Sequence, residues 1–570
     1  MRTGLSSFIL VATLAIVACG PSSQTAASRA DSAGGGLAST VSSRTLNVIM
    51  RVEPPTMMDS SVDRAAVHKP LFSANLAYWN LQNEPYPVLS ESIPQLNTDT
   101  WRVFPEGRME TTFRLKGGLA WHDGTPLTAD DFVFGRRVAI ARVDWGLDQT
   151  SAEVRQVDEV LAPDARTVVI KWKQPFMLAA GPESLPFPRH ILQPALDQGD
   201  GEAFGNLPYW TTEYVGAGPY RVDRWERGAF IEGAAFDKFA LGQPKVSRIR
   251  LTWNNDPNVS LTRLIAGDAD VALDGSLRFD QARVLKEQWI PQTGGTILLN
   301  PTSLRYIQVQ ARPEYANPKA LLDSRVRKAI QHSIDRAALA ETMLDDSSMV
   351  ADTVPPPSVP YYAEVMRAVA RYPYDLRAAE QLMARVGYAK GPDGVFVSQT
   401  DGRFHLEIRG VSGGQEEQDT TIVAGNLRDG GLDPTMMLLP SSTRAVDDRT
   451  KGTFPGLTLN NNTLQIGLGL NKWLTSNIGG PWDNWTGGNR MGWSNAEFDQ
   501  TYEQWSTTLD RADSARLMAQ MMKVLGDELP SPPLYYNFQI LAYSGALTGP
   551  QVITPDSTRF GNIHEWMWKQ

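Results

Sequence analysis

Hydrophobic and polar residues alternate in some stretches of the chain and recur at helical spacing in others, which predicts a mixed α/β protein. Residues 111–115 alternate like a strand and are followed by a Lys-Gly-Gly turn, and residues 168–172 predict another strand after a turn at 163–165. A turn at Asp123-Gly124 leads into a helix that is expected to continue through Arg136 to Ala141. Thr128 and Asp131 have the spacing that caps a helix start.

Three further helices are predicted by their apolar stripes. The strongest pattern begins with Asp323 or Ser324 as the cap, and its small and apolar residues lie on one helical face: Val326, Ala329, Ile330, Ser333, Ile334 and Ala337. Its polar residues Arg325, Arg327 and Asp335 are expected in a salt-bridged surface. Another helix runs from Asp375 to a glycine cap at Gly387, and the last carries a Met and Leu stripe from Met518 to Leu529.

The N-terminal part predicts export rather than folded structure. The apolar run from Phe8 to Ala18 is too short to span a bilayer, so residues 1–18 are expected to be a signal peptide. Cys19 is the only cysteine and has small neighbours, so this end resembles a lipoprotein precursor in which Cys19 is acylated; the alternative is an ordinary buried cysteine. Residues 19–44 are rich in Ser, Ala, Thr and Gly and predict a flexible tether with a reach of roughly 25–30 Å. No second apolar run is long enough to span a membrane, so we expect a soluble body held in the periplasm or at the outer face of the cytoplasmic membrane.

Composition excludes several classes of function. The body exceeds 500 residues, so two or three domains are expected. The net charge is −9 with acids and bases interspersed, and no basic stripe indicates nucleic-acid binding. The six histidines are scattered without metal-ligand spacing, so we expect no metal and no cofactor. No phosphate-binding Gly-Lys-Ser/Thr loop is present, so any ATPase would be a separate chain.

Six segments, in order, are similar to the bacterial extracellular solute-binding proteins of family 5, which include the oligopeptide-, dipeptide- and nickel-binding group. They are Trp-His-Asp-Gly-Thr-Pro-Leu-Thr-Ala-Asp-Asp-Phe from residue 121, Gly-Ala-Gly-Pro-Tyr from 216, Asp-Ser-Arg-Val-Arg-Lys-Ala-Ile from 323, Tyr-Asp-Leu-Arg-Ala-Ala-Glu from 374, Gly-Trp-Ser-Asn-Ala-Glu-Phe-Asp from 492 and Leu-Pro-Ser-Pro-Pro-Leu-Tyr-Tyr from 529. Gly216 and Gly218 are interpreted as structural, because they permit a close approach that a side chain would block.

The resemblance implies a two-lobed periplasmic-binding-protein-like α/β fold (type II, cluster C) with an extra subdomain in the first lobe. The first lobe would be discontinuous, comprising residues 45–75, 209–300 and 536–570; the subdomain would span 76–208 and the second lobe 301–535. The implied function is the substrate-binding component of an ABC importer, a monomer that captures a peptide or another small polar solute between the lobes and delivers it to permease and ATPase subunits. No enzymatic activity is expected.

The ligand contacts are less clear from the sequence. Peptide-binding relatives commonly place an Asp for the peptide amine in a Trp-containing stretch, but here residues 452–471 are uncharged. Asn460, Asn461 and Asn462 could bind a polar ligand through their amides or form a surface turn. The other candidate ligand-binding residues are Trp79, Trp482, Asp483, Trp485 and Arg490, with Asp483 for an amine and Arg490 for a carboxylate. Each of these could instead be structural.

Two alternative functions remain open from the sequence. Residues 410–414 match the Gly-x-Ser-x-Gly nucleophile elbow, so a secreted serine hydrolase using Ser412 is one alternative, although His564 is the only histidine that follows it. The resemblance implies instead that this stretch is a strand followed by a helix. The other alternative is a surface sensor without a transporter, which shares all of these features.

Overall fold

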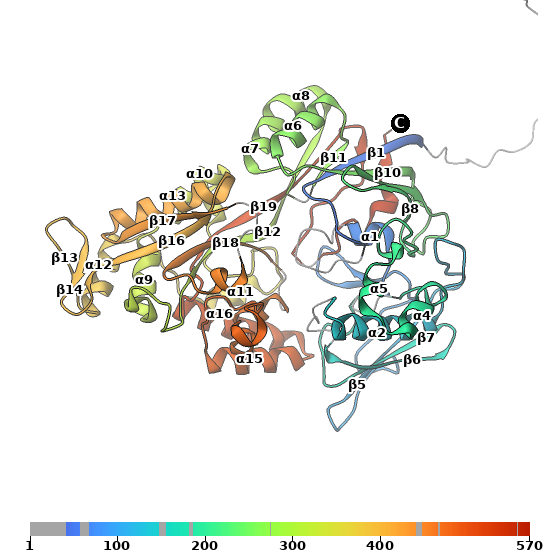
Figure 1. The fold of residues 1–570 in the computed structure, drawn as a ribbon, viewed down its shortest axis with the longest axis horizontal. Coiled ribbons are helices and arrows are strands. Elements are labelled where there is room, and N and C mark those ends of the chain that lie inside the picture. Colours follow the sequence, from blue (N-terminus) through green and yellow to red (C-terminus); the bar gives the residue numbers. More distant parts are fainter. Residues whose placement is uncertain are drawn as a thin grey trace, which may run out of the picture. The chain divides into compact units, whose positions relative to one another are not determined.

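The computed structural model describes residues 42–57, 68–147, 155–181, 186–273, 275–440, 447–464, 468–555 and 557–569. The expected signal peptide, Cys19 and almost the whole tether lie outside these residues. Residues 42–570 form one compact unit (Figure 1). Its hydrophobic cores are largely separate: two are built mainly from residues 46–273 and the C-terminal segment, and another two from residues 307–535.

A ten-stranded sheet runs through the unit and contains strands of both lobes. In spatial order its strands are β17 (Asp433–Leu439), β16 (His405–Val411), β18 (Leu457–Thr463), β12 (Thr296–Val309), β19 (Pro533–Tyr543), β11 (Val271–Ala272), β1 (Ser42–Met50), β10 (Val246–Trp253), β9 (Phe230–Ala235) and β8 (Tyr220–Glu226). Strand β1 lies parallel to both of its neighbours, and its Val48 and Ile49 are buried in two different cores on opposite faces. A parallel strand that is covered on both faces explains why residues 46–50 are mostly apolar rather than alternating.

Two long strands connect the lobes. β12 and β19 pair antiparallel from Thr296↔Tyr543 to Tyr306↔Pro533, and the second half of β12 also pairs with β18. The register shifts between Asn300 and Ser303, where Pro301 has no N–H group to donate to the ladder. The expected lobe boundary after residue 300 coincides with this irregularity, whereas the boundary after residue 535 falls inside β19. These boundaries stay predictions.

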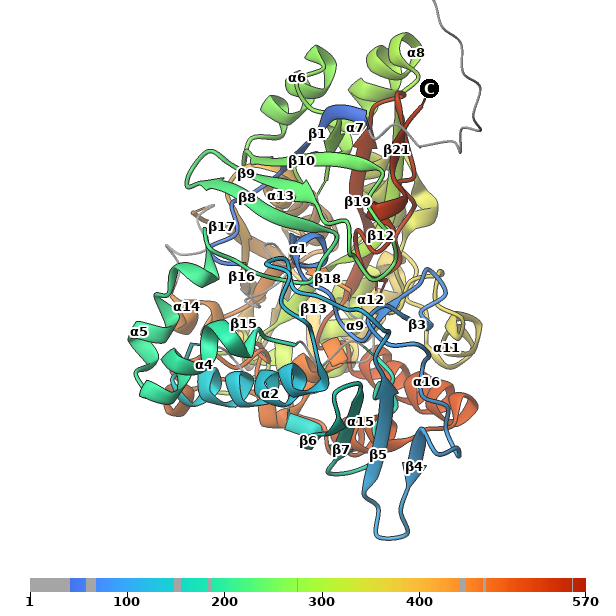
Figure 2. The same cartoon turned by 90° about the vertical axis from the view of Figure 1, so that its right-hand side faces the viewer.

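The subdomain carries a separate four-stranded sheet in the order β4 (Trp101–Val103), β5 (Met109–Arg114), β7 (Thr167–Trp172) and β6 (Val157–Asp164). Helix α2 (Ala129–Asp144) lies beside this sheet (Figure 2). The predicted strands and helix are confirmed here, including the role of Asp131, whose carboxylate accepts a hydrogen bond from the Thr128 N–H at 2.9 Å.

The predicted helix from Asp323 is two helices, α9 (Ser324–His332) and α10 (Arg336–Leu344). The Ser333 hydroxyl donates to the Ala329 carbonyl at 2.8 Å, and the Asp335 carboxylate caps the next helix by accepting from the Ala338 N–H at 2.9 Å. Ile334 is fully buried between the two helices. The single-helix prediction was therefore wrong beyond His332, because the Asp335 N–H donates to the Asn426 side chain at 2.8 Å in place of a helical carbonyl while the Asp335 carboxylate starts the next helix.

A second correction concerns Arg327, which was expected on a salt-bridged surface. Its side chain is buried, donates to the carbonyls of Leu321 and Leu322 at 2.9 Å and pairs with Glu528. Arg327 therefore ties α9 to the end of α16 (Arg511–Glu528).

The other two helix predictions are confirmed. α12 (Leu376–Arg385) is capped by Asp375, which accepts from the Arg377 and Ala378 N–H groups, and Gly387 has a left-handed φ of 87°. In α16 the methionines of the predicted stripe are buried in a core. The other α-helices of the described residues are α1 (Lys69–Phe72), α4 (Arg189–Gln198), α5 (Gly201–Gly205), α6 (Pro257–Ala266), α7 (Phe279–Val284), α8 (Ile290–Thr293), α11 (Tyr362–Ala368), α13 (Gly414–Asp429), α14 (Asp448–Gly452) and α15 (Ala496–Thr507).

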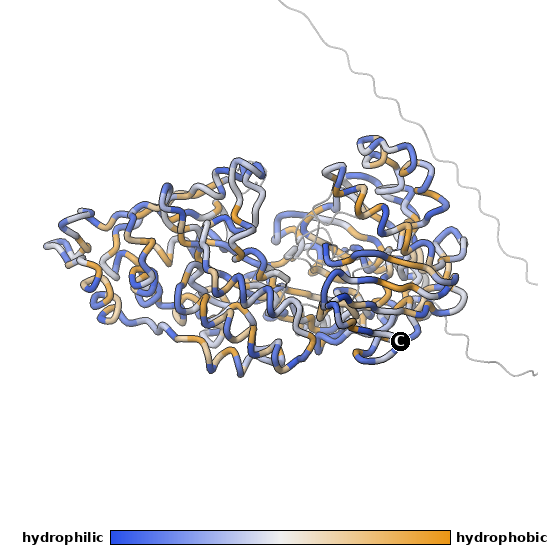
Figure 3. Tube along the Cα trace, turned by 90° about the horizontal axis from the view of Figure 1, so that it is seen from below, coloured by the Kyte–Doolittle hydropathy of each residue, from blue (hydrophilic) through white to orange (hydrophobic). Residues whose placement is uncertain are grey.

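Hydrophobic and hydrophilic residues are mixed along the trace in both lobes (Figure 3). In the part of the chain that the structure describes, every helix is too short or too polar to cross a membrane.

Candidate functional site

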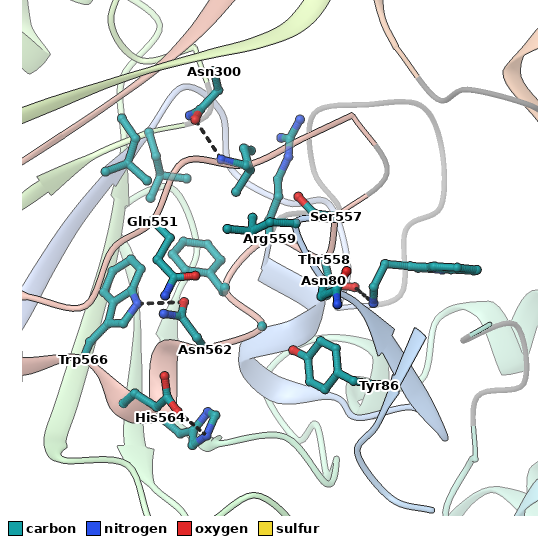
Figure 4. Close-up of a pocket in the computed structure, with 18 of the residues that line it drawn as sticks. Asn80, Tyr86, Asn300, Gln551, Ser557, Thr558, Arg559, Asn562, His564 and Trp566 are labelled. Atoms are coloured by element: carbon teal, nitrogen blue, oxygen red, sulfur yellow. Dashed lines mark hydrogen bonds and ion pairs between the residues drawn. The ribbon is translucent and has the colours of Figure 1, made fainter. Parts of the chain in front are cut away.

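A cavity of about 460 Å³ lies in the first lobe and is bounded by three segments that are distant in the sequence (Figure 4). The first is the hairpin of β2 (Ala77–Trp79) and β3 (Pro85–Pro87), the second is the β12–β19 ribbon, and the third is the C-terminal segment 551–566. The volume lies within the range of about 300–1,000 Å³ that is usual for small-molecule sites.

The hairpin and the C-terminal segment are joined by two hydrogen bonds between Trp79 and Thr558. The Trp79 N–H donates to the Thr558 hydroxyl at 3.0 Å, and the Thr558 N–H donates to the Trp79 carbonyl at 3.0 Å. The Asn80 side-chain oxygen accepts from the N–H groups of Gln82 and Glu84, both at 2.9 Å, and so closes the turn of the hairpin. These bonds fix the backbone of one cavity wall.

The β12–β19 wall carries two amide side chains that face each other across the ladder, Asn300 and Gln539. The Asn300 side-chain oxygen accepts from the Ile553 N–H at 2.9 Å. The Gln539 side-chain oxygen accepts from Arg559 at 2.5 Å. The C-terminal segment is thus attached to the strands that connect the lobes.

The apolar part of the lining combines leucine and isoleucine side chains with four aromatic residues, Trp79, Tyr86, Phe560 and Trp566. The rings of Phe560 and Trp566 pack at 5.6 Å, and the indole N–H of Trp566 donates to the side chain of Asn562 at 3.1 Å. Burial, and secondarily the charge of Glu565, raises the pKa of Tyr86 to about 12, so this phenol stays protonated at neutral pH.

His564 also lines the cavity and is mostly buried, packing against Phe239 at 5.6 Å. Burial lowers the pKa of His564, so the imidazole is neutral near pH 7. Its Nδ1 atom is buried without a hydrogen-bond partner among the described residues. The cavity therefore presents a neutral histidine rather than a cation.

Of the predicted ligand-binding residues, Trp79 lines the cavity. Asn460, Asn461 and Asn462 are part of β18, opposite Tyr306, Arg305 and Leu304 of β12. They form a strand and not the surface turn that was the alternative. Successive side chains on a strand point to opposite faces, so Asn461 is separated from the other two.

Trp482, Asp483, Trp485 and Arg490 lie in one loop of the second lobe, away from the cavity lining. The Asp483 carboxylate accepts from the N–H groups of Gly480 at 2.7 Å and of Trp485 and Gly487 at 3.0 Å. This bonding favours the structural role for Asp483 over a ligand amine. Trp482 is 77% exposed, and Arg490 lies 3.6 Å from Asp448.

The loop depends on a residue that sequence reasoning missed, Arg312. Its buried guanidinium donates to the carbonyls of Gly452 at 2.6 Å and Gly479 at 3.0 Å, and also to that of Arg490. The C-terminal segment 551–566 was also missed as a site, although residues 558–566 combine arginine, amide, histidine and aromatic side chains within nine positions. The high density of these residue types was the sequence signal that could have identified the segment as a candidate site.

The Gly-x-Ser-x-Gly stretch does not meet its proposed histidine. Ser412 follows β16, near one end of the ten-stranded sheet, and leads into α13. His564 packs on Phe239, and its carbonyl accepts from Lys245 just before β10, toward the other end of the sheet. The strand–turn–helix expected from the resemblance is confirmed. Within the described ranges, no three or more His, Cys, Asp and Glu residues are grouped so as to hold a metal ion.

A family model described as bacterial extracellular solute-binding proteins, family 5 Middle, matches residues 91–464. The oligopeptide-binding protein AppA of Bacillus subtilis is 22% identical over 371 residues, 64% of this chain and 65% of that protein, so the match spans slightly less than two thirds of the relative. The glutathione-binding protein GsiB of Escherichia coli K12 is 26% identical over 455 residues, which are 77% of this chain and 80% of GsiB.

Solved structures have the same fold. NikZ from Campylobacter jejuni in complex with Ni(L-His) aligns with a TM-score of 0.72 at 18% identity and covers 92% of this chain and 99% of NikZ. The oligopeptide-binding protein from Thermus thermophilus complexed with a pentapeptide aligns with a TM-score of 0.72 at 22% identity. The alignment covers 92% of this chain and 96% of the Thermus protein. The predicted two-lobed α/β binding-protein fold is confirmed.

Proposed function

Because this chain belongs to family 5 of the bacterial extracellular solute-binding proteins, we propose that it is the substrate-binding component of an ABC importer. It captures a small polar solute, with peptides among the candidates since AppA and GsiB are named for oligopeptide and glutathione binding. Family members are binding proteins, which argues against the serine hydrolase and for a chain without enzymatic activity.

The observation that carries this proposal is the cavity itself. It is lined by polar, aromatic and aliphatic side chains, and the hairpin that forms one wall also reaches the second lobe, where Glu84 lies 3.9 Å from Arg511. A solute in the cavity would therefore lie beside a contact between the lobes, where it can favour a closed arrangement over an open one.

Ligand binding is tested by a thermal-shift screen of the purified protein against peptides, amino acids, sugars, polyamines and metal chelates. A ligand that binds only the folded state raises the unfolding midpoint by mass action. At a free concentration one hundred times its Kd, it adds about 2.7 kcal/mol to the free energy of unfolding. Trp79→Ala should weaken binding and Trp482→Ala should not, because the second tryptophan lies outside the cavity. Hydrolysis of an ester or amide without any specific binding would contradict the proposal.

The partners and location follow from the same role. We expect a monomer, anchored on the outer side of the cytoplasmic membrane or in the periplasm through acylated Cys19, that delivers its solute to permease and ATPase subunits. Cells expressing the chain should incorporate radiolabelled palmitate into it, and Cys19→Ser should abolish the label and release the protein from membranes. Equal labelling of the variant would contradict the anchor.

A further inference from the structure

Amide side chains dominate the polar lining of the cavity. Six of the described residues that line it are amides, whereas three are ionisable at acidic or neutral pH or carry a permanent charge, namely Arg559, His564 and Glu565. The amides are Asn80, Gln82, Asn300, Gln539, Gln551 and Asn562. A planar amide donates through its NH₂ group and accepts through its oxygen, so it complements a group that does both.

Several of these amides are held in fixed orientations. The side-chain oxygens of Asn80, Asn300 and Gln539 are occupied by backbone N–H groups or by Arg559, which leaves the NH₂ group of each amide for another acceptor. The side chains of Gln82 and Gln551 make no hydrogen bond to the residues that the structure describes, and both border the cavity. The wall thus offers oriented donors together with adaptable donor–acceptor groups.

Trp79 provides a rigid aromatic surface beside these amides. Its backbone is fixed by Thr558 on both its N–H and carbonyl sides. Its indole rests against Gly181, where an added Cβ atom would lie 2.6 Å from the ring. The contact with Gly181 restrains the indole on one side, and an aromatic residue that borders the cavity can pack against apolar C–H groups of a ligand.

The charged groups of the lining are poorly suited to the two ends of a peptide. Glu565 is the one carboxylate among the described lining residues; its side chain is 58% exposed and lies 3.9 Å from the imidazole of His564. Solvent screens such a group, so it attracts an amine weakly. Arg559 is the one permanent cation among the described lining residues, and part of its guanidinium is already used by the side-chain oxygen of Gln539; burial lowers the pKa of His564, so that ring is uncharged near pH 7.

From these contacts we infer that the solute of this cavity is a neutral, polyhydroxylated molecule of the saccharide class. Its hydroxyl groups donate and accept, as the amides do, and the C–H face of its ring packs on Trp79. This inference rests on the proposed function, since it names the class of solute that the importer component carries.

The test is a calorimetric titration of the full-length protein with two probe sets. One contains neutral di- and trisaccharides, including cellobiose, maltose, xylobiose and raffinose, and the other contains Ala-Ala, Ala-Ala-Ala and Gly-Gly-Gly. We expect a saccharide to bind and its Kd to change less than about twofold from low salt to about 0.5 M NaCl, because no ion pair forms. Trp79→Ala should raise that Kd by about tenfold or more, while Trp79→Phe retains part of the affinity.

Gln551→Ala provides a second variant, because Gln551 is exposed in the structure and its truncation should leave the fold unchanged. It should weaken saccharide binding, whereas Trp482→Ala should not. Binding of the peptides but not the saccharides would overturn the saccharide assignment and leave the proposed function intact. Binding of neither set would overturn both, and saccharide binding unaffected by Trp79→Ala and Gln551→Ala would overturn the assignment to this cavity.

Discussion

At the scale of single residues, His122 joins two of the sequence motifs that carry the family resemblance. Its Nδ1 atom accepts a hydrogen bond from the Gly216 N–H at 3.1 Å, and its Nε2–H donates to the Gly218 carbonyl at 3.0 Å. Only the neutral imidazole can do both. Burial is the largest cause that lowers the pKa of His122 to about 4. His122, which precedes the predicted turn at Asp123-Gly124, is therefore a buried connector between two segments.

This bonding predicts a pH dependence of stability. Between pH values of about 6.5 and 4 the unfolded chain binds a proton at His122 and the folded protein does not, so the free energy of unfolding falls as the pH falls through that window, by up to about 3 kcal/mol. Urea unfolding at several pH values should show a shallower slope for His122→Gln. The exposed His405 provides a control for the substitution itself, because His405→Gln replaces a histidine without removing a buried contact. Equal slopes for wild type and His122→Gln would refute the assignment.

The glycines that contact this histidine were expected to allow a close approach, and one of them offers a sharp test. A Cβ atom at Gly218 would lie 2.4 Å from the carbonyl carbon and 2.8 Å from the Cα of Phe72, which are backbone atoms that cannot rotate away. Gly218→Ala should therefore reduce the free energy of unfolding by about 3 kcal/mol or more in urea denaturation. The control is Gly425→Ala in the middle of α13, where nothing lies within 4 Å, and it should raise stability by up to about 1 kcal/mol. Similar losses in both variants would contradict the steric argument.

At the scale of elements, the periodic patterns predicted the existence of helices better than their ends. The predicted stripe is buried from Val326 to Ile334, in the core that also contains Leu339 of α10, whereas Ala337 beyond the break is exposed. Periodicity predicts the buried face only while the helix is continuous, and it does not report where the backbone breaks. The local competition at Ser333 and Asp335 decided that, and these residue types favour caps as well as exposed helical positions.

The start of α10 can be tested through its cap. Asp335→Ala removes the acceptor for the Ala338 N–H and should reduce the free energy of unfolding by about 1 kcal/mol. Asp335→Asn keeps an acceptor oxygen and should stay close to wild type. Guanidinium or urea titrations of the three proteins measure the difference. If the alanine variant were as stable as wild type, the break between the helices would have another cause.

The candidate site is formed by segments that lie far apart in the chain, and the sequence does not show that these segments meet. Trp79 was predicted because the family resemblance places a cleft-lining segment there, yet its partner Thr558 is 479 positions away. No local periodicity connects two such segments, and their pairing is decided by the tertiary arrangement of the hairpin, the β12–β19 ribbon and the C-terminal segment. The motifs identified the fold, since motif residues such as Gly218 and Asp131 serve packing and capping, whereas the cavity residues lie mostly outside them.

At the scale of the whole molecule, the side-chain contacts between the lobes that the described residues make involve single side chains, among them the Arg283–Asp345 pair at 3.7 Å and Phe279 on a core of the second lobe. Met177 of the subdomain packs against a core of the second lobe, with its sulfur 3.6 Å from the Ser514 hydroxyl, and Leu509 packs against a core of the subdomain. The Glu84–Arg511 pair at 3.9 Å is largely exposed and therefore contributes little. Such contacts can be broken and reformed without unfolding either core, so the backbone strands β12 and β19 are left as the permanent connection.

Ligand binding should therefore shift the distance between the lobes at these contacts. In a Cys19→Ser background, spin labels at Glu84→Cys and Arg511→Cys report the separation by double electron–electron resonance. A ligand identified by calorimetry should move the distribution toward the short distance, because Glu84 belongs to the hairpin that forms one wall of the cavity and lies 3.9 Å from Arg511 of the second lobe. Labels at Asp429→Cys and Arg511→Cys, both in the second lobe, should show no change. If the ligand binds while both distributions stay the same, closure around the cavity is not how this protein holds its solute, and the importer would have to recognise the bound form by another surface difference.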